Sequence, residues 1–428
     1  MEAPLADFIR GTPDGEAAQA ILRKCVHCGF CTATCPTYQL LGDELDGPRG
    51  RIYLIKEMLA GAEVTAVTQT HLDRCLTCRA CETTCPSGVE YGRLLDIGRK
   101  VADARIGRSP WQRLRRRALR RAMSDRRVFG ALLGLGRLVR GLLPPVLRAM
   151  IPRRQAAGTW PAALHARRML VLDGCVQPAL APRINAAAAR VLDRLGISLL
   201  RVPQAGCCGA LAQHLDAQEE ALGLMRRNID AWWPLLQQGA EAIVMTASGC
   251  GTMVKEYGHL LRHDPVYADK AARVAGATKD LAEILAGEAG SITPVAGGLR
   301  VAFQSPCTLQ HGQKLAGVVE DLLRGAGCEL LPVADAHLCC GSAGTYALLQ
   351  PELSRRLRDD KLRVLRAGRP AVIATANIGC LNYLQGQAEV PVVHWIELLD
   401  VPRGTVPPSG GFRHCGTCAG AARYRTDG

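Results

Sequence analysis

The chain has 428 residues, of which 48% are hydrophobic and 21% charged, as is typical of a folded globular protein with two or three domains. Aromatic residues make up 4% of the chain, too few for a nucleic-acid surface that stacks bases on aromatic rings. The first residues carry acids and no apolar segment, and no run of about 18 uncharged apolar residues occurs. We therefore expect no secretory signal, no membrane-spanning helix and a cytoplasmic location.

Most of the formal net charge of +14 comes from one segment. Residues 108–154 hold 14 arginines, no lysine and one acid, Asp125, so this segment is +13 and the remainder is nearly neutral. Its second half, from Val128 to Leu143, is apolar and is interrupted by two arginines. An apolar stretch with arginines is what an interfacial helix on the anionic inner face of the cell membrane needs. The alternative is a linker helix that packs on its own domain, with arginines that are solvated or pair with an acidic partner.

The 19 cysteines carry the most information, because cysteines of a reducing compartment serve metal or redox chemistry and not disulfides. The run from Cys25 to Pro36 has the pattern C-x2-C-x2-C-x3-C-P, and the run from Cys75 to Pro86 repeats it. In bacterial ferredoxins that hold two [4Fe–4S] clusters, the fourth cysteine of each run ligates the other cluster. We therefore expect one cluster on Cys25, Cys28, Cys31 and Cys85, and the second on Cys75, Cys78, Cys81 and Cys35. A zinc ribbon is the alternative, but it needs only four cysteines.

The segment between the two motifs indicates the kind of ferredoxin. A turn at Asp46–Arg51 is followed by apolar spacing over 52–59 that suits a helix. We therefore expect an α-helical ferredoxin domain over residues 1–107, followed by a basic connector over 108–165.

The rest of the chain contains two copies of one unit, which we place at 166–290 and 291–405, before a tail at 406–428. Apolar strand-like runs alternate with helical patterns in both copies, and this alternation predicts parallel sheets with helices on both faces. The step from Cys175 to Cys207 is 32 residues, as is the step from Cys307 to Cys339. The carboxyl ends of parallel strands meet at one edge of a sheet, so we expect four thiols to converge in each copy. The two candidate ligand sets are Cys175, Cys207, Cys208 and Cys250, and Cys307, Cys339, Cys340 and Cys380.

Four thiolates suit either a cubane cluster or structural zinc, so the metal of the repeats stays open between a [4Fe–4S] cluster and zinc. Three cysteines fall outside these groups. Cys328 is expected to be a small packed hydrophobe within a strand. Cys415 and Cys418 form a C-x2-C in a Gly-rich tail that lacks a second half.

Two C-x2-C-x2-C-x3-C-P motifs followed by two Cys-Cys-Gly repeats resemble the cysteine-rich (CCG) family. Members include the iron–sulfur subunits of glycolate oxidase, anaerobic glycerol-3-phosphate dehydrogenase and heterodisulfide reductase. Residues 25–38 and 41–56 look most like the glycolate oxidase subunit. Met253 and Tyr383 stand where the heterodisulfide reductase branch has a further cysteine, which argues against disulfide reduction by this chain.

The resemblance implies an electron-transfer subunit that works beside flavin-binding glycolate oxidase subunits and passes electrons to a quinone-level acceptor. Oxidation of lactate or glycerol 3-phosphate, and a catalytic heterodisulfide-reductase-like role, are the alternatives. The chain has no G-x-G-x-x-G after a strand and no P-loop, so we expect no flavin or NAD site on it. We also expect no catalytic residue for the hydroxy acid and no nucleic-acid partner.

Overall fold

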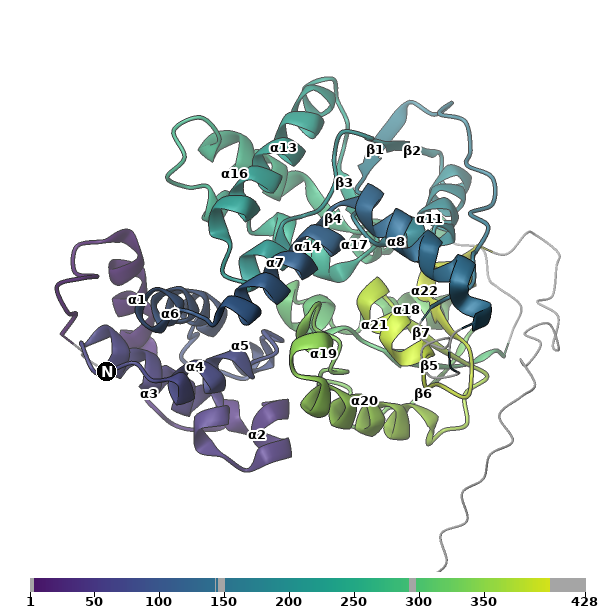
Figure 1. The fold of residues 1–428 in the computed structure, drawn as a ribbon. Coiled ribbons are helices and arrows are strands. Elements are labelled where there is room, and N and C mark those ends of the chain that lie inside the picture. Colours follow the sequence, from purple (N-terminus) through teal and green to yellow (C-terminus); the bar gives the residue numbers. More distant parts are fainter. Residues whose placement is uncertain (1–3, 143, 145–150, 292–297, 401–428) are drawn as a thin grey trace, which may run out of the picture.

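The computed structural model describes residues 4–142, 144, 151–291 and 298–400. Figure 1 shows a helical domain beside two α/β repeats, with the first repeat drawn above the second. Residues 4–107 form helices and turns without a strand, and each repeat contains a four-stranded parallel sheet. The predicted fold class, an α-helical ferredoxin-like domain followed by two α/β repeats, is confirmed. The tail that carries Cys415 and Cys418 lies outside the described residues.

The helical domain is built around the crossing of α3 and α6. Gly98 on α6 permits this crossing, because a Cβ there would lie 2.7 Å from Cγ1 of Ile55 on α3. Ile55 and its apolar neighbours on both helices are fully buried. The helices of this domain are α1 (Pro13–Lys24), η1 (Phe30–Thr32), α2 (Pro36–Leu41), η2 (Glu44–Asp46), α3 (Pro48–Leu59), α4 (Ala66–Asp73), α5 (Ala80–Thr83) and α6 (Tyr91–Ile106).

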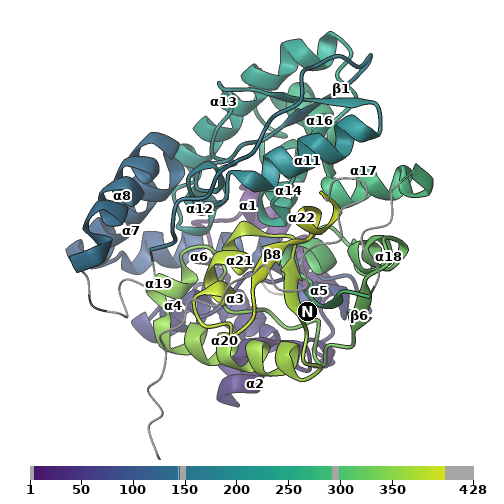
Figure 2. The ribbon, with the colours of Figure 1, turned by 90° about the vertical axis from the view of Figure 1, so that its right-hand side faces the viewer.

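The basic segment folds into α7 (Pro110–Ser124), α8 (Arg126–Val139) and the short η3 (Arg140–Leu142), and Figure 2 shows α7 and α8 lying together along one edge of the molecule. Arg116 is 9% exposed and lies 3.2 Å from Asp73 of the helical domain and 3.0 Å from Asp216 of the first repeat. Arg108 pairs with the same two aspartates. This face of α7 therefore joins the two domains, as the linker alternative expects.

Each repeat has its strands in the same order, and every pairing is parallel. The first sheet runs β2-β1-β3-β4 and the second runs β6-β5-β7-β8. The first repeat contains β1 (Arg167–Val171), α10 (Gln177–Leu180), α11 (Arg183–Arg194), β2 (Ile197–Arg201), α12 (Ala210–His214), α13 (Gln218–Gln237), β3 (Ile243–Met245), α14 (Ser248–Lys255), α15 (Tyr257–Leu260), α16 (Ala268–Ala277), β4 (Thr278–Asp280), α17 (Leu281–Gly287) and η4 (Ala289–Ser291). The second contains β5 (Arg300–Gln304), η5 (Thr308–Gly312), α18 (Val318–Gly325), β6 (Glu329–Leu331), α19 (Tyr346–Leu349), α20 (Pro351–Arg366), β7 (Val372–Thr375), α21 (Ile378–Gln385), β8 (Val392–His394) and α22 (Trp395–Leu399).

Cys328 is buried, as expected for a packed small hydrophobe, but the strand begins one residue later, at Glu329.

The two repeats pack together around one shared apolar core. Helix α11 of the first repeat contacts α22 of the second, and α17 of the first contacts α18 of the second, so the contacts follow a pseudo-twofold relation. The ends of β3 and β7 also meet, because the Ser248 N–H donates to the Ala376 carbonyl at 3.1 Å. His394 adds a second link, with its Nε2 2.8 Å from the Thr246 carbonyl.

His394 should make the stability of this interface sensitive to acid. Its Nδ1 faces the Ile396 N–H at 3.3 Å as an acceptor and its Nε2 faces a carbonyl, so the neutral ring satisfies both contacts. Burial lowers the pKa of His394 to about 4, whereas an unfolded histidine titrates near 6.5. The folded form therefore resists protonation. The free energy of unfolding is highest above about pH 6.5 and decreases as the pH falls toward 4, and the loss is about 2 kcal/mol at pH 5.

Denaturant unfolding at pH 7 and pH 5 measures this loss. We expect His394→Asn, which can still cap α22, to lose less stability between the two pH values than the wild type does. The exposed His263→Asn is the matched control and should behave as the wild type. An unchanged pH dependence in His394→Asn would contradict the prediction.

Candidate metal centres

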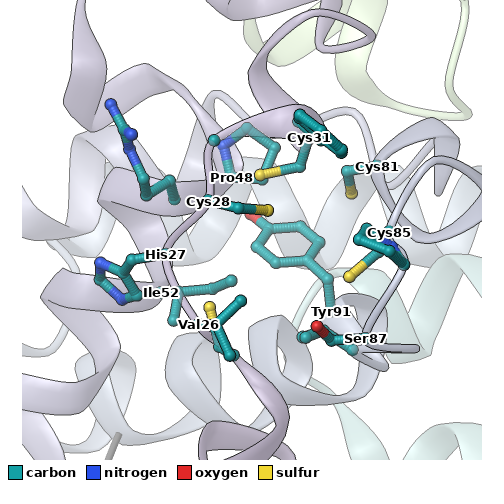
Figure 3. A pocket seen from close by; sticks show the side chains of 16 residues that line it. Val26, His27, Cys28, Cys31, Pro48, Ile52, Cys81, Cys85, Ser87 and Tyr91 are labelled. Carbon is teal, nitrogen blue, oxygen red and sulfur yellow. The ribbon is translucent and has the colours of Figure 1, made fainter.

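The first cysteine motif lines a cavity of about 440 Å³, which we call site one. Cys25, Cys28, Cys31 and Cys85 all contribute to its wall. Figure 3 shows Cys28, Cys31 and Cys85 around this space, with the ring of Tyr91 among them. Cys28 is exposed, as are its neighbours Val26 at 69% and Phe30 at 63%, so site one lies at the surface of the molecule.

The second motif lines a smaller cavity of about 290 Å³, which we call site two. Its cysteines are Cys35, Cys75, Cys78 and Cys81. Burial raises the pKa of Cys78 and Cys81 well above the ordinary thiol value. Such thiols stay protonated when they are free, and a metal that binds them as thiolates supplies the positive charge that displaces the proton.

The fourth cysteine of each motif lines the cavity of the other motif. Cys85 belongs to the wall of site one, and Cys35 belongs to the wall of site two. The proline that follows Cys35 is the first residue of α2, so the chain turns away from its own loop at that position. Apart from Cys81, which lines both cavities, the two cavities thus group the cysteines as the motif spacing predicts. Their role as ligands stays a prediction.

The separation of the sulfur atoms fits clusters better than single zinc ions. Four thiolates around one zinc, at about 2.3 Å each, lie about 3.8 Å apart, whereas the corners of a cubane hold them farther apart. Among the residues that the structure describes, one group of three possible metal ligands has its ligand atoms within 4.8 Å of one another. It consists of Asp43, Asp46 and His71 and contains no cysteine. No three cysteine sulfurs among the described residues are therefore as close together as a single zinc ion would hold them.

The acidic set around Asp46 has a structural role. Asp46 is fully buried and lies 3.3 Å from Arg51, 2.8 Å from Arg74 and 3.1 Å from His71. Two guanidinium groups already neutralise this carboxylate, which leaves it a poor ligand for a cation.

Two buried arginines place positive charge beside site two. Arg51, which lines the cavity, also donates to the His71 carbonyl at 2.7 Å and to the Thr37 hydroxyl at 3.1 Å. Arg99, 6% exposed, donates to the carbonyls of Leu72 and Cys75 at 2.8 Å each. Because Arg99 binds carbonyls, its charge is not cancelled by a carboxylate contact and is available to offset a negative cluster.

The cysteines of the first repeat meet at the carboxyl edge of its sheet. Cys175 follows β1, the Cys207–Cys208 pair follows β2, and Cys250 lies in the first turn of α14 after β3. Cys175 and Cys208 lie close enough to Cys207 to lower the pKa of its thiol. Asn228 fixes the pair by donating to the Cys207 carbonyl at 2.9 Å, and Tyr257 does so by donating to the Cys208 carbonyl at 2.7 Å.

The second repeat brings its cysteines together in the same way. The Cys307 and Cys339 sulfurs are 3.9 Å apart, and Cys340 and Cys380 follow β6 and β7. Cys340 lies close enough to Cys339 and Cys380 for both to affect the pKa of its thiol, which is raised well above the ordinary value. Lys361, 4% exposed, takes the place that Asn228 has in the first repeat, and it donates to the Asp335 carbonyl at 2.8 Å. The second set therefore has a buried cation beside it where the first has a neutral amide.

The second repeat packs directly against site two. Cys78, Cys307 and Cys339 belong to one apolar cluster with Leu76 and Tyr346, although Cys78 is more than 200 residues from the other two cysteines in sequence. The Tyr346 hydroxyl donates to the Arg74 carbonyl at 3.0 Å, which joins α19 to the end of α4. Thr83 and His311 add a second contact at 3.0 Å.

Motif spacing missed several residues of these sites, namely Tyr91, Arg99, Asn228 and Lys361. Each lies on a helix outside the cysteine motifs, and each is of an ordinary type for its helix. In each repeat, one residue of a later helix packs on the glycine of the Cys-Cys-Gly turn. Asn228 and Lys361 each lie seven residues after that helix residue, so aligning the two repeats would have paired them.

Comparison with known proteins agrees with this geometry. Residues 21–89 match the 4Fe-4S dicluster domain, and residues 169–255 and 301–385 match the cysteine-rich domain. The glycolate oxidase iron-sulfur subunit of Escherichia coli (strain K12) is 54% identical over 401 residues, which cover 94% of this chain and 98% of that protein. The probable glycolate oxidase iron-sulfur subunit of Bacillus subtilis (strain 168) is 30% identical over 421 residues, covering 88% and 93%. Lactate utilization protein A of Bacillus licheniformis is 28% identical over 237 residues, covering 53% of this chain and 96% of that protein.

The fold and its cysteine sites define an iron–sulfur protein, with a dicluster ferredoxin domain followed by two cysteine-rich repeats, whose clusters serve electron transfer. The chain belongs to the family of glycolate oxidase iron–sulfur subunits.

The crossed arrangement of the two cavities predicts which cysteine variants behave alike. Cys35→Ser should give the same spectroscopic losses as Cys78→Ser, because both residues line site two. Cys85→Ser should instead match Cys28→Ser. Each variant should lose or alter one cluster of about four iron atoms, as seen by iron analysis and electron paramagnetic resonance of the anaerobic protein. The control Cys328→Ser should change neither, and a match between Cys35→Ser and Cys28→Ser would contradict the assignment.

Proposed function

We propose that this chain carries electrons from the flavin subunits of a glycolate oxidase complex to a quinone-level acceptor, and does not oxidise glycolate by itself. The observation that carries the proposal is the continuous line of cysteine sites from the exposed Cys28 through the interior. In this proposal the ligands of the two ferredoxin clusters are the cysteines of site one and site two, and the repeats hold further clusters on their own four cysteines.

Contacts between neighbouring sites support this path. Tyr91 and Cys81 line both site one and site two, so these sites share a wall. Site two then meets the second repeat where Cys78 packs with Cys307 and Cys339. The rate of electron transfer falls steeply with distance, so sites that share walls can exchange electrons efficiently.

The two repeat sites are joined in turn by Asn377. Its Nδ2 lies 3.5 Å from the Cys380 sulfur of the second site, and its Oδ1 accepts from the Gly249 N–H at 3.4 Å, one residue before Cys250 of the first site. A path from the surface at Cys28 can therefore run through all four sites without a break.

Glycolate is the substrate we propose for the complex, because the relatives that cover nearly the whole chain are named glycolate oxidase subunits. Lactate is the second candidate, because the lactate utilization proteins also align, over about half of this chain. Removal of a hydride from either hydroxy acid needs a flavin or nicotinamide, after which the flavin divides the electron pair for one-electron carriers. We assign that step to the partner subunits.

The chain purified alone should accept electrons from dithionite and pass them to an artificial acceptor, yet oxidise no glycolate. Adding the flavin subunits should produce glycolate-dependent quinone reduction. Cys78→Ser, at the junction of site two and the second repeat, should lower that rate by more than tenfold while the flavin subunits still reduce a direct dye acceptor. Glycolate oxidation by the isolated chain, or quinone reduction at the wild-type rate in Cys78→Ser, would refute the proposal. Lactate in place of glycolate tests the second candidate.

We also propose that α7 and α8 rest on an anionic membrane surface. No helix among the described residues is long and apolar enough to cross a bilayer. Leu132, Leu135 and Leu138 of α8 are 52%, 60% and 82% exposed, and Trp111 of α7 is 70% exposed. Exposed arginines without an ion pair among the described residues accompany them, namely Arg113, Arg117, Arg121 and Arg127. Apolar side chains flanked by unpaired arginines are what an interfacial helix presents to anionic lipid.

The three arginines on one face of α7 provide the test. Replacing Arg113, Arg117 and Arg121 together by Gln should weaken binding to anionic vesicles by more than about a hundredfold. The reason is that each basic residue near such a surface contributes about 1 kcal/mol. Vesicle sedimentation at moderate salt measures the change. Replacing Arg273, Arg324 and Arg363, exposed on the repeats, removes the same charge and should leave binding intact. Equal loss in both variants would show only a general charge effect. Arg116 is unsuitable, because it is buried between domains.

A further inference from the structure

Tyr91 is the side chain that stands between the two ferredoxin sites. It is the first residue of α6 and is 4% exposed. Its side chain lines the cavity of site one and also that of site two. Figure 3 shows its ring inside the cysteine cage of site one, between Cys28 and Cys85. A residue in this position touches both proposed clusters and belongs to neither ligand set.

The hydroxyl of Tyr91 has no hydrogen-bond partner among the residues that the structure describes. A buried donor that has lost its water and gained no partner destabilises the fold, so buried hydroxyl groups are almost always satisfied. An acceptor must therefore come from whatever fills the neighbouring cavity.

Site two is the cavity that this hydroxyl can serve. Tyr91 lines this cavity together with Cys75, Cys81 and Arg51. The sulfur atoms of an iron–sulfur cluster and of its cysteine ligands accept hydrogen bonds, and such bonds raise the reduction potential of the cluster.

We propose that Tyr91 donates a hydrogen bond to sulfur in site two and thereby makes site two the more easily reduced of the two ferredoxin sites. The inference rests on the proposed ligand sets. The bond stabilises the extra negative charge when one electron moves from site one to site two, and no proton or covalent bond changes in that step. Buried Arg99, which donates to the Cys75 carbonyl, acts in the same direction. Tyr91 is thus a positioning residue that directs electrons inward, away from the exposed Cys28.

The test is a redox titration of the anaerobically purified chain, followed by electron paramagnetic resonance and without glycolate or flavin subunits. Tyr91→Phe removes the hydroxyl and keeps the ring. The equilibrium constant for reducing site two should fall about tenfold, which for one electron is a shift of about 59 mV to lower potential. The potential of site one should stay unchanged. Cys78→Ser identifies which signal belongs to site two.

Two further variants separate the hydroxyl from the ring. Tyr91→Leu should produce the same shift at site two, and Tyr53→Phe, on the exposed face of α3, should produce none. Unchanged potentials in Tyr91→Phe would overturn the proposal, as would an equal shift at both sites, a shift seen only in Tyr91→Leu, or loss of the clusters. Failure of glycolate-dependent turnover would instead count against the proposed function, since the titration uses neither substrate nor partner.

Discussion

Holding several thiolates inside a protein is the electrostatic constraint on which the rest of this structure depends. Each buried negative charge costs free energy unless a positive charge or hydrogen bonds offset it. The fold meets the cost with buried cations that bind carbonyl oxygens: Arg99 beside site two, and Lys361 beside the second repeat site. A cation that binds only carbonyl oxygens still offsets the negative charge of a cluster. The positive charge of Arg49, near site one, is instead largely offset by the carboxylate of Glu44.

The sequence predicts the cysteine groups well because their geometry is local or follows from topology. Three thiols at short intervals must face one cavity, and the crossed positions of Cys35 and Cys85 follow from the extra residue and the proline. The repeated step of 32 residues and the parallel strands place the repeat cysteines at the sheet edges. By contrast, Arg116 and Arg117 look equivalent in sequence. The positions of Asp73 and Asp216, which both lie distant in sequence, decide that Arg116 is buried whereas Arg117 is exposed.

The two repeats share a fold but provide different surroundings for their cysteines. Both place a glycine of positive φ after the cysteine pair, Gly209 and Gly341, where a Cβ would meet the following helix. The first repeat then offers the neutral Asn228 and the second the cationic Lys361. Repeat symmetry fixes where the thiols lie, whereas the residues that tune them come from helices whose composition has diverged. Equal cysteine patterns therefore do not imply equal redox properties.

The position of α7 gives the proposed path a direction toward the membrane. Its last residue, Ser124, lies close enough to Cys207 of the first repeat site to lower the pKa of that thiol, and α8 begins two residues later with the exposed leucines along its length. The site farthest along the line from Cys28 is thus the one nearest the proposed membrane face. Arg108 and Arg116 fix this arrangement, because they bind Asp73 of the helical domain and Asp216 of the first repeat together. The basic segment, which looks like a linker in sequence, therefore sets both the distance between the domains and the face on which electrons would leave.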